Sequence, residues 1–164
     1  MKIYSKSTKS AKSSLSWRMA VALLAMGLPL PALGALGASL NSVTDDQVHL
    51  KATITITAAG TYTIHEMTAP TGTVVREYVS RSGRVFGDTR KGPLIPDLRQ
   101  LLGTYFEHYL EAAKREREGH VGRAPLDIHE PGLVVQTAGH MRAYYGRAYD
   151  PGSLPAGVSD HDMR

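Results

Sequence analysis

Apolar residues recur at steps of three and four positions between Leu98 and Ala113, and this spacing restricts the possible folds most. A helix turns once in 3.6 residues, so the spacing collects the apolar side chains along one face. Pro96 and Asp97 precede the stripe, and a first-turn proline with a carboxylate near the amino end favours a helix start. A charged run and then Gly119 follow, which predicts the helix end. Such a helix needs an apolar surface to cover.

Segments with the two-residue period of a β-strand lie on both sides of this helix. Glycine-containing turns separate four of them, which span residues 50–58, 61–68, 73–80 and 84 to about 89. A short polar entry around Asp45 and Asp46 precedes them. Because short turns join neighbouring strands antiparallel, we expect a meander. Three further strands are predicted over residues 126–130, 133–137 and 141–149, with Ala138 and Gly139 in the last turn.

The expected fold class is therefore α+β. It combines an antiparallel meander of about four strands, one amphipathic helix packed on the sheet, and then two or three further strands. We expect a secretory leader over residues 1–34, a single domain over residues 35–150, and a flexible tail over residues 151–164, which is rich in Pro, Gly, Ser and Asp.

The leader has the charge pattern of a secretory signal. A basic, serine-rich stretch ends at Arg18, an apolar run follows over residues 19–30, and small residues come next. We expect cleavage after Gly34, with Ala32 and Gly37 as alternatives. An uncleaved membrane anchor is the competing interpretation, but prolines and glycines in this stretch disfavour a spanning helix.

Charge and cysteine content exclude several classes of protein. The chain carries 19 Lys and Arg against 15 Asp and Glu; the leader holds five of the cations and no acid, so residues 35–164 have 14 against 15, a net charge of −1. A near-neutral domain attracts polyanions weakly, so no nucleic-acid partner is expected. The absence of cysteine excludes disulfides, thiolate metal sites and a lipid-modified cysteine. We expect no membrane span once the leader is removed.

Histidines are the main candidates for catalytic chemistry, because no phosphate loop, nucleophile elbow or metalloprotease motif occurs. His140 stands beside a predicted turn and is a candidate proton carrier. Glu77 or Asp97 would have to fold against it to complete an acid–base pair. No cofactor and no metal site are predicted.

Other histidines are adjacent to acids without forming a catalytic pattern. His65 and His129 each precede a glutamate, but neighbours on a strand point to opposite faces. The sequence Asp-His-Asp over residues 160–162 lies in the expected tail, where a rigid set of metal ligands is not favoured.

Arginine and tyrosine residues are the candidates for binding. Arg142 and Tyr144 would share one face of the last strand, and Arg76 and Tyr78 one face of the third. Cations and aromatic rings suit a polysaccharide or a nucleic acid, whereas burial of the tyrosines in the core is the alternative. Glu77 falls on the face that its valine neighbours bury, so we expect it to pair with an arginine.

Arg99 and Arg142 are the arginines considered as partners for Glu77, because a buried charge needs a counterion. A pair of this kind would be structural and not catalytic.

Three segments resemble an exported proteobacterial family catalogued as domain of unknown function 2844. They are Val-Arg-Glu-Tyr-Val-Ser at residues 75–80, Pro-Asp-Leu-Arg-Gln-Leu-Leu-Gly at 96–103 and Gly-His-Met-Arg-Ala-Tyr at 139–144. The resemblance implies a periplasmic or secreted location in Gram-negative bacteria and no established activity. Such proteins usually continue the fourth strand with apolar residues and a tryptophan, where this chain has Gly-Asp-Thr-Arg-Lys at residues 87–91. That departure predicts a frayed or exposed strand end.

The sequence favours an exported protein, periplasmic or secreted, that binds a partner protein or another envelope component. The second face of its sheet carries Thr, His and Arg and would meet that partner. The alternative is a small envelope hydrolase or metal-dependent enzyme that uses His140 with a carboxylate.

Overall fold

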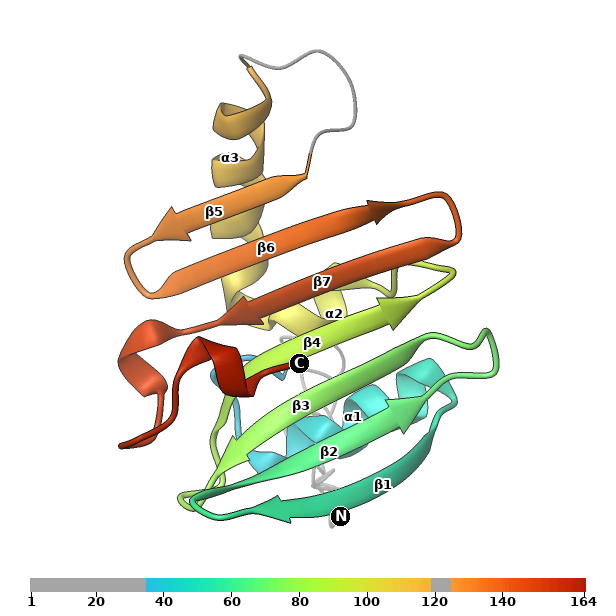
Figure 1. Ribbon diagram of the computed structural model, residues 1–164, viewed down its shortest axis with the longest axis vertical. Coiled ribbons are helices and arrows are strands. Elements are labelled where there is room, and N and C mark those ends of the chain that lie inside the picture. Colours follow the sequence, from blue (N-terminus) through green and yellow to red (C-terminus); the bar gives the residue numbers. More distant parts are fainter. Residues whose placement is uncertain (1–34, 119–124) are drawn as a thin grey trace, which may run out of the picture. The chain divides into compact units, whose positions relative to one another are not determined.

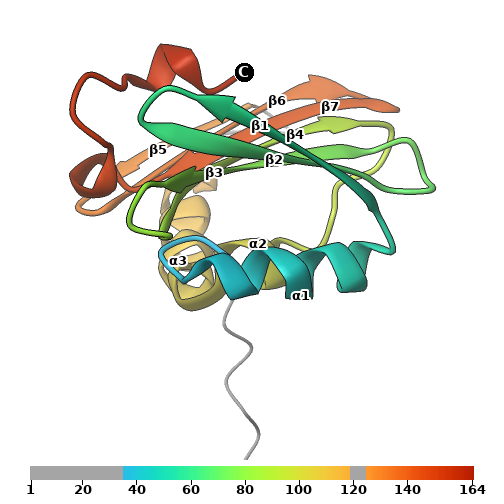
Figure 2. The same ribbon diagram turned by 90° about the horizontal axis from the view of Figure 1, so that it is seen from below.

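A computed structural model describes residues 35–118 and 125–164, which form one antiparallel sheet with helices on one face (Figures 1 and 2). The helices are α1 (Leu40–Leu50), α2 (Leu98–Leu102) and α3 (Phe106–Arg117), with a short 3-10 helix, Gly103–Tyr105, joining the last two. The strands are β1 (Thr53–Ala59), β2 (Tyr62–Thr68), β3 (Val74–Ser80), β4 (Val85–Gly92), β5 (Leu126–Glu130), β6 (Leu133–His140) and β7 (Ala143–Tyr149).

The seven strands lie in the order β1-β2-β3-β4-β7-β6-β5. The predicted α+β class is confirmed: a four-stranded meander, a helical segment and three further strands share one antiparallel sheet. The expected leader and the helix end at Gly119 lie outside the described residues. Within the described residues, no helix is both long enough and apolar enough to cross a membrane.

The helix layer covers one face of the sheet in two parts (Figure 2). Under α1, Val43 packs with Met67, Val75 and other residues of β2 to β4. Under α3, Tyr109 packs with Ile128 and other residues of β5 to β7. The predicted apolar stripe from Leu98 to Ala113 therefore does cover the sheet, mainly in the part under α3, while its Leu101 joins the cluster under α1.

Helix α1 is a correction to the expectation of a polar entry followed by a strand from Leu50. The segment has β-branched and short polar residues, which are poor helix formers, so its sequence gives little local signal. Tertiary packing supplies the missing stabilisation, because Val43 and Asp46, three positions apart, both face the sheet and are buried.

Strand β4 also corrects the expectation of a frayed or exposed end. It runs to Gly92 between β3 and β7, and its residues from Val85 to Arg90 are buried. Both of its edges are hydrogen-bonded to neighbouring strands, so β4 is a central strand and its end is not an exposed edge.

The turn between β6 and β7 lies later than expected. Ala138 and Gly139 continue β6, which ends at His140, and Met141 with Arg142 forms the turn. Arg142 adopts a left-handed conformation with φ of 65°, so it does not share a strand face with Tyr144 as predicted.

The segment after β7 is the one for which the sequence predicts a flexible tail. It contains two short 3-10 helices, Pro151–Ser153 and Asp160–Asp162, and returns across the sheet face opposite the helices (Figure 2). Met163 is 1% exposed and packs in a cluster with Tyr78 and Phe86. Residues 151–164 therefore cover part of the face that was expected to be free for a partner.

Candidate functional site

A groove of about 860 Å³ lies between the helix layer and the sheet. Its sheet wall comes from the adjacent strands β4, β7, β6 and β5, and its helix wall from α2, α3 and the loop before α2. The volume is within the range of small-molecule sites. The lining residues are Arg90, Lys91, Gly92, Leu94, Ile95, Pro96, Leu98, Tyr109, Arg117, Pro125, Leu126, Thr137, Ala138, Gly139, His140, Met141, Tyr144, Tyr145 and Gly146.

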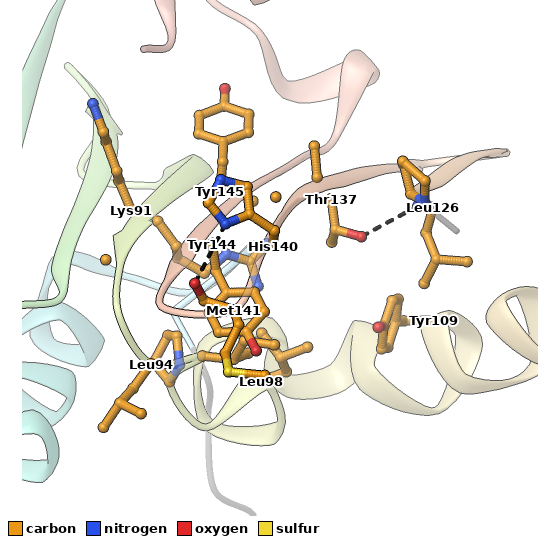
Figure 3. A pocket seen from close by; sticks show the side chains of 18 of the residues that line it. Lys91, Leu94, Leu98, Tyr109, Leu126, Thr137, His140, Met141, Tyr144 and Tyr145 are labelled. Carbon is orange, nitrogen blue, oxygen red and sulfur yellow. Dashed lines mark hydrogen bonds between the residues drawn. The ribbon is translucent and has the colours of Figure 1, made fainter. Parts of the chain in front are cut away.

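Apolar side chains are concentrated on the rim of the groove. Leu94, Ile95 and Met141 are 54%, 59% and 80% exposed, although residues of this kind are usually buried. Figure 3 shows Leu94 and Met141 with other apolar side chains at one end of the groove, and Tyr109 facing Leu126 at the other. An exposed apolar patch around a cavity is typical of a binding site.

Two close backbone approaches hold the rim in place. Gly92 lies against Thr73, since a Cβ on Gly92 would be 2.5 Å from Thr73 Cα, and the Thr73 hydroxyl donates to the carbonyl of Leu94 at 3.0 Å. Gly139 has φ of 116°, and a Cβ there would be 2.2 Å from the carbonyl oxygen of Ala143. Only glycine fits at these two positions, so the loop before α2 and the β6–β7 hairpin keep their shape.

Arg90 is the buried cation of the groove, with a side chain that is 4% exposed. Its guanidinium lies over Gly146, where a Cβ would be 3.2 Å from Nε and 3.5 Å from Nη2. Nε forms an ion pair with Asp88 Oδ1 at 2.8 Å, but this contact lacks hydrogen-bond geometry, and none of Nε, Nη1 and Nη2 has a hydrogen-bond acceptor within the described part of the chain. A buried guanidinium with unpaired N–H groups is costly unless an acceptor reaches them.

Three buried carboxyl groups lie on the same side of the sheet as Arg90. Glu77 pairs with Asp88 in the β3–β4 register, and Asp46 faces them from α1, where its Oδ1 accepts from Gln100 Nε2 at 2.5 Å. Burial raises the pKa of Asp88 to about 6, although the Arg90 charge acts to lower it.

Burial also raises the pKa of Glu77 well above its ordinary value, and the charges of Asp46 and Asp88 raise it further. The pKa of Asp46 is likewise raised by burial. When Glu77 and Asp46 are both ionised, neither carboxylate can donate a hydrogen bond to the other. Neither oxygen of Glu77 has a hydrogen-bond donor among the described residues. Burial and the neighbouring acids therefore favour the protonated form of Glu77.

The structure separates the three residues considered for catalysis. His140 lines the groove, where its Nδ1 lies 3.3 Å from the carbonyl oxygen of Met141, and no carboxylate is among the lining residues that the structure describes (Figure 3). Glu77 is fully buried beneath α1. Asp97 caps α2 by accepting from the backbone N–H of Arg99 at 2.9 Å, and its other oxygen lies 3.7 Å from His49.

The expected partners of Glu77 are also different. Arg99 pairs with Glu107 at 2.9 Å and stacks on Phe106, and Arg142 lies in an exposed turn. The prediction that Glu77 is buried is confirmed, but the expectation of an arginine partner is wrong, because its neighbours are acids.

Among the residues considered for binding, only Tyr144 lines the groove. Arg76 and Tyr78 lie on the opposite face of the sheet, where Arg76 pairs with Glu66 at 2.6 Å. The Tyr78 hydroxyl donates to the carbonyl oxygen of Arg164 at 3.1 Å and accepts from its N–H at 3.0 Å. Arg76 also donates to that carbonyl. Both residues therefore hold the C-terminal segment against the sheet.

The remaining histidines and acids make local contacts. His65 is buried on the helix side of β2, and Asp127 contacts His129 two positions along β5. Asp160 pairs with Arg147 at 3.0 Å. Across residues 35–118 and 125–164, no three His, Asp or Glu side chains are grouped so that they could hold a metal ion.

The model of one family, described as protein of unknown function (DUF2844), matches residues 32–163. The chain belongs to this family. Comparison of the DUF2844 chain with curated proteins finds no match, and neither does comparison with solved structures. The resemblance based on residues 75–80, 96–103 and 139–144 is thus confirmed over nearly the whole described region.

Sequence reasoning missed Arg90 and the groove of this DUF2844 domain. Arg90 was assigned to a strand end expected to fray, so its burial was not considered. One signal was present: Asp88 and Arg90 alternate with Thr89, so they share one face of a strand. Which face is buried, however, depends on the pairing of β4 with β7 across the helical segment.

Proposed function

We propose that this chain is exported and that its domain binds an apolar or amphiphilic component of the cell envelope in the groove. The observation that carries the proposal is the combination of an 860 Å³ cavity with the exposed side chains of Leu94, Ile95 and Met141 on its rim. Such side chains gain most when a ligand removes them from water. The pattern of residues 1–34 supports export.

Binding is favoured over hydrolysis because of the position of His140. A general base needs a partner that orients it and a substrate proton within reach. The groove offers His140 no carboxylate from the described residues, and Glu77 and Asp97 have other surroundings. The groove instead offers shape and apolar surface, which are the requirements of a binding site.

Export is tested by fractionating cells that express the full chain and measuring the mass of the product. We expect a periplasmic or secreted protein that has lost residues 1–34 and begins at Ala35. Cleavage after Ala32 or Gly37 would still support export. A cytosolic product that retains Met1 would contradict it.

Groove binding is tested with the neutral fluorophore N-phenyl-1-naphthylamine, whose emission rises in apolar surroundings. We expect the protein to bind it, and Ile95→Ser to weaken binding by about 3–10-fold, because part of an apolar contact is lost. Titration of the fluorophore at fixed protein concentration measures the dissociation constants.

The matched control is Ile56→Ser. Ile56 is 60% exposed, almost the same as Ile95 at 59%, but it lies on β1 and does not line the groove. We expect it to leave the affinity unchanged. Equal effects of the two substitutions, or no binding by the unmodified protein, would count against the groove as the binding site.

A further inference from the structure

The chemical class of the ligand follows from the polar groups that line the groove, if the groove is the binding site proposed above. Arg90 lines the groove, its Nε, Nη1 and Nη2 are buried and lack a protein acceptor within the described chain, and its side chain is more than nine-tenths buried. Two N–H groups of one guanidinium form a planar fork that matches the oxygens of a carboxylate or a phosphate.

The charged groups of the lining are all cations. Arg90 and Lys91 lie on β4 and Arg117 at the end of α3, and no Asp or Glu of the described residues lines the groove. Asp88 forms an ion pair with Arg90 at Nε, but no hydrogen bond between the two is made, so Arg90 lacks an acceptor for all of its side-chain N–H groups within the described chain. This arrangement favours an anionic group and disfavours a cationic one.

The rest of the groove requires an apolar ligand body. Leu98, Tyr109 and Leu126 line it, with Leu98 near Leu94 and Met141 at the rim and with Tyr109 and Leu126 at the other end (Figure 3). The sheet wall crosses four strands, which corresponds to roughly 14 Å at the usual strand spacing. That length suits one extended hydrocarbon chain better than a globular ligand.

We infer that the groove binds a single-chain amphiphile with an anionic head group, held by Arg90, and a hydrocarbon chain directed towards Tyr109 and Leu126. Carboxylate and phosphate heads share the required chemistry, because both offer two or more oxygens to the guanidinium. Two acids, Asp88 and Glu77, lie beneath Arg90 and oppose an added negative charge. Comparing an anionic with a neutral head group therefore shows whether the attraction of Arg90 outweighs the repulsion of these acids.

The test compares four ligands with the same twelve-carbon chain on the purified product of the full chain. Dodecanoate, dodecyl phosphate, dodecanol and dodecyltrimethylammonium are titrated below their micellar concentrations by isothermal calorimetry or by displacement of the fluorophore. We expect the two anions to bind about 10-fold or more tightly than dodecanol, since hydrogen bonds to a charged group are strong. The ammonium compound should bind most weakly.

The outcomes separate this inference from the proposed function. Equal binding of dodecanol and the anions would overturn the anionic head group and leave apolar binding in place. Tightest binding of the ammonium compound would also overturn it. If none of the four ligands binds, the proposed function fails as well. Tighter binding of one anion than of the other identifies the head group.

Variants locate the head group. Arg90→Gln should abolish the preference for anions over dodecanol, and Arg90→Lys, which keeps the charge, should retain part of it. Arg81→Gln, at the exposed β3–β4 turn, is the control and should leave the preference unchanged. If Arg90→Gln does not fold, Gly146→Ala is the second variant, because its Cβ displaces the guanidinium by a few tenths of an ångström. It should lower the ratio of the dodecanol dissociation constant to that of the anions. An unchanged ratio in the folded variants would overturn the role of Arg90.

Discussion

Replacing Arg90 with glutamine is expected to lower the free energy of unfolding by about 3–5 kcal/mol at neutral pH. The substitution leaves Asp88, which is 1% exposed, without its cationic neighbour and close to two further acids. A buried charge that loses its partner keeps the full cost of leaving water. Urea denaturation followed by circular dichroism measures the loss.

The size of the loss should depend on pH. The pKa of Asp88 is about 6 in the folded protein, above its ordinary value of 3.8. A raised carboxyl pKa means that the folded state holds the proton more tightly than the unfolded state does. Protonation of Asp88 therefore stabilises the fold in acid, and this stabilisation is lost as pH rises through about 6. Arg90→Gln should therefore be less harmful at about pH 5 than at about pH 7.5, where Asp88 is ionised.

In the unmodified protein, deprotonation of Asp88 alone lowers the free energy of unfolding by about 2 kcal/mol as pH rises from about 4.5 to about 7.5. Asp46 and Glu77 act in the same direction, because their pKa values are also raised. His65 acts in the opposite direction: burial lowers its pKa, so its contribution is present at high pH and lost as pH falls. The pKa values of Asp127 and Asp162 are lowered and matter only in stronger acid.

Arg99→Gln is the control for the loss of an ion-paired arginine. Arg99 pairs with Glu107, but both side chains are more than 60% exposed, so we expect a loss below about 1 kcal/mol. Glu77→Gln is the complementary variant: its amide carries no charge at any pH and removes one of the buried acids, so it should stabilise the domain at about pH 7.5 and leave it unchanged in acid. If Arg90→Gln and Arg99→Gln were equally stable, the buried cluster would not have the assigned charges.

Replacing Met163 with aspartate is expected to release the C-terminal segment and to cost about 2–4 kcal/mol. Met163 is 1% exposed, and its sulfur occupies the space that Gly87 leaves, where a Cβ would be 2.6 Å away. A carboxylate at this position has no cation in the apolar cluster around Tyr78 and Phe86. Limited proteolysis with mass spectrometry should show early cleavage in residues 150–164, and urea denaturation gives the stability loss.

His161→Asp introduces the same side chain two positions earlier. The His161 side chain is 85% exposed, so we expect a change within about 0.5 kcal/mol and no early cleavage. Equal cleavage of both variants and the unmodified protein within residues 150–164 would mean that this segment is released already, as its composition predicted.

The secondary structure that depends on local spacing was predictable. The stripe from Leu98 to Ala113 gives a helical period, and the alternating segments give strands, because each period follows from the geometry of the chain itself. Helix α1 was not predictable in this way. Its helical state depends on Val43 and Asp46 packing against strands that follow it in the chain.

By itself, the sequence determined the α+β class, the family and the burial of Glu77, since these follow from patterns within short segments or along the whole chain. Only the tertiary structure decided what surrounds Glu77 and where Arg90 lies. Strand register brings Asp88 beside Glu77, and the return of β7 to β4 places Arg90 over Gly146 in the groove. Contacts between residues far apart in the chain depend on which strands pair, and a local pattern of side chains does not specify the pairing.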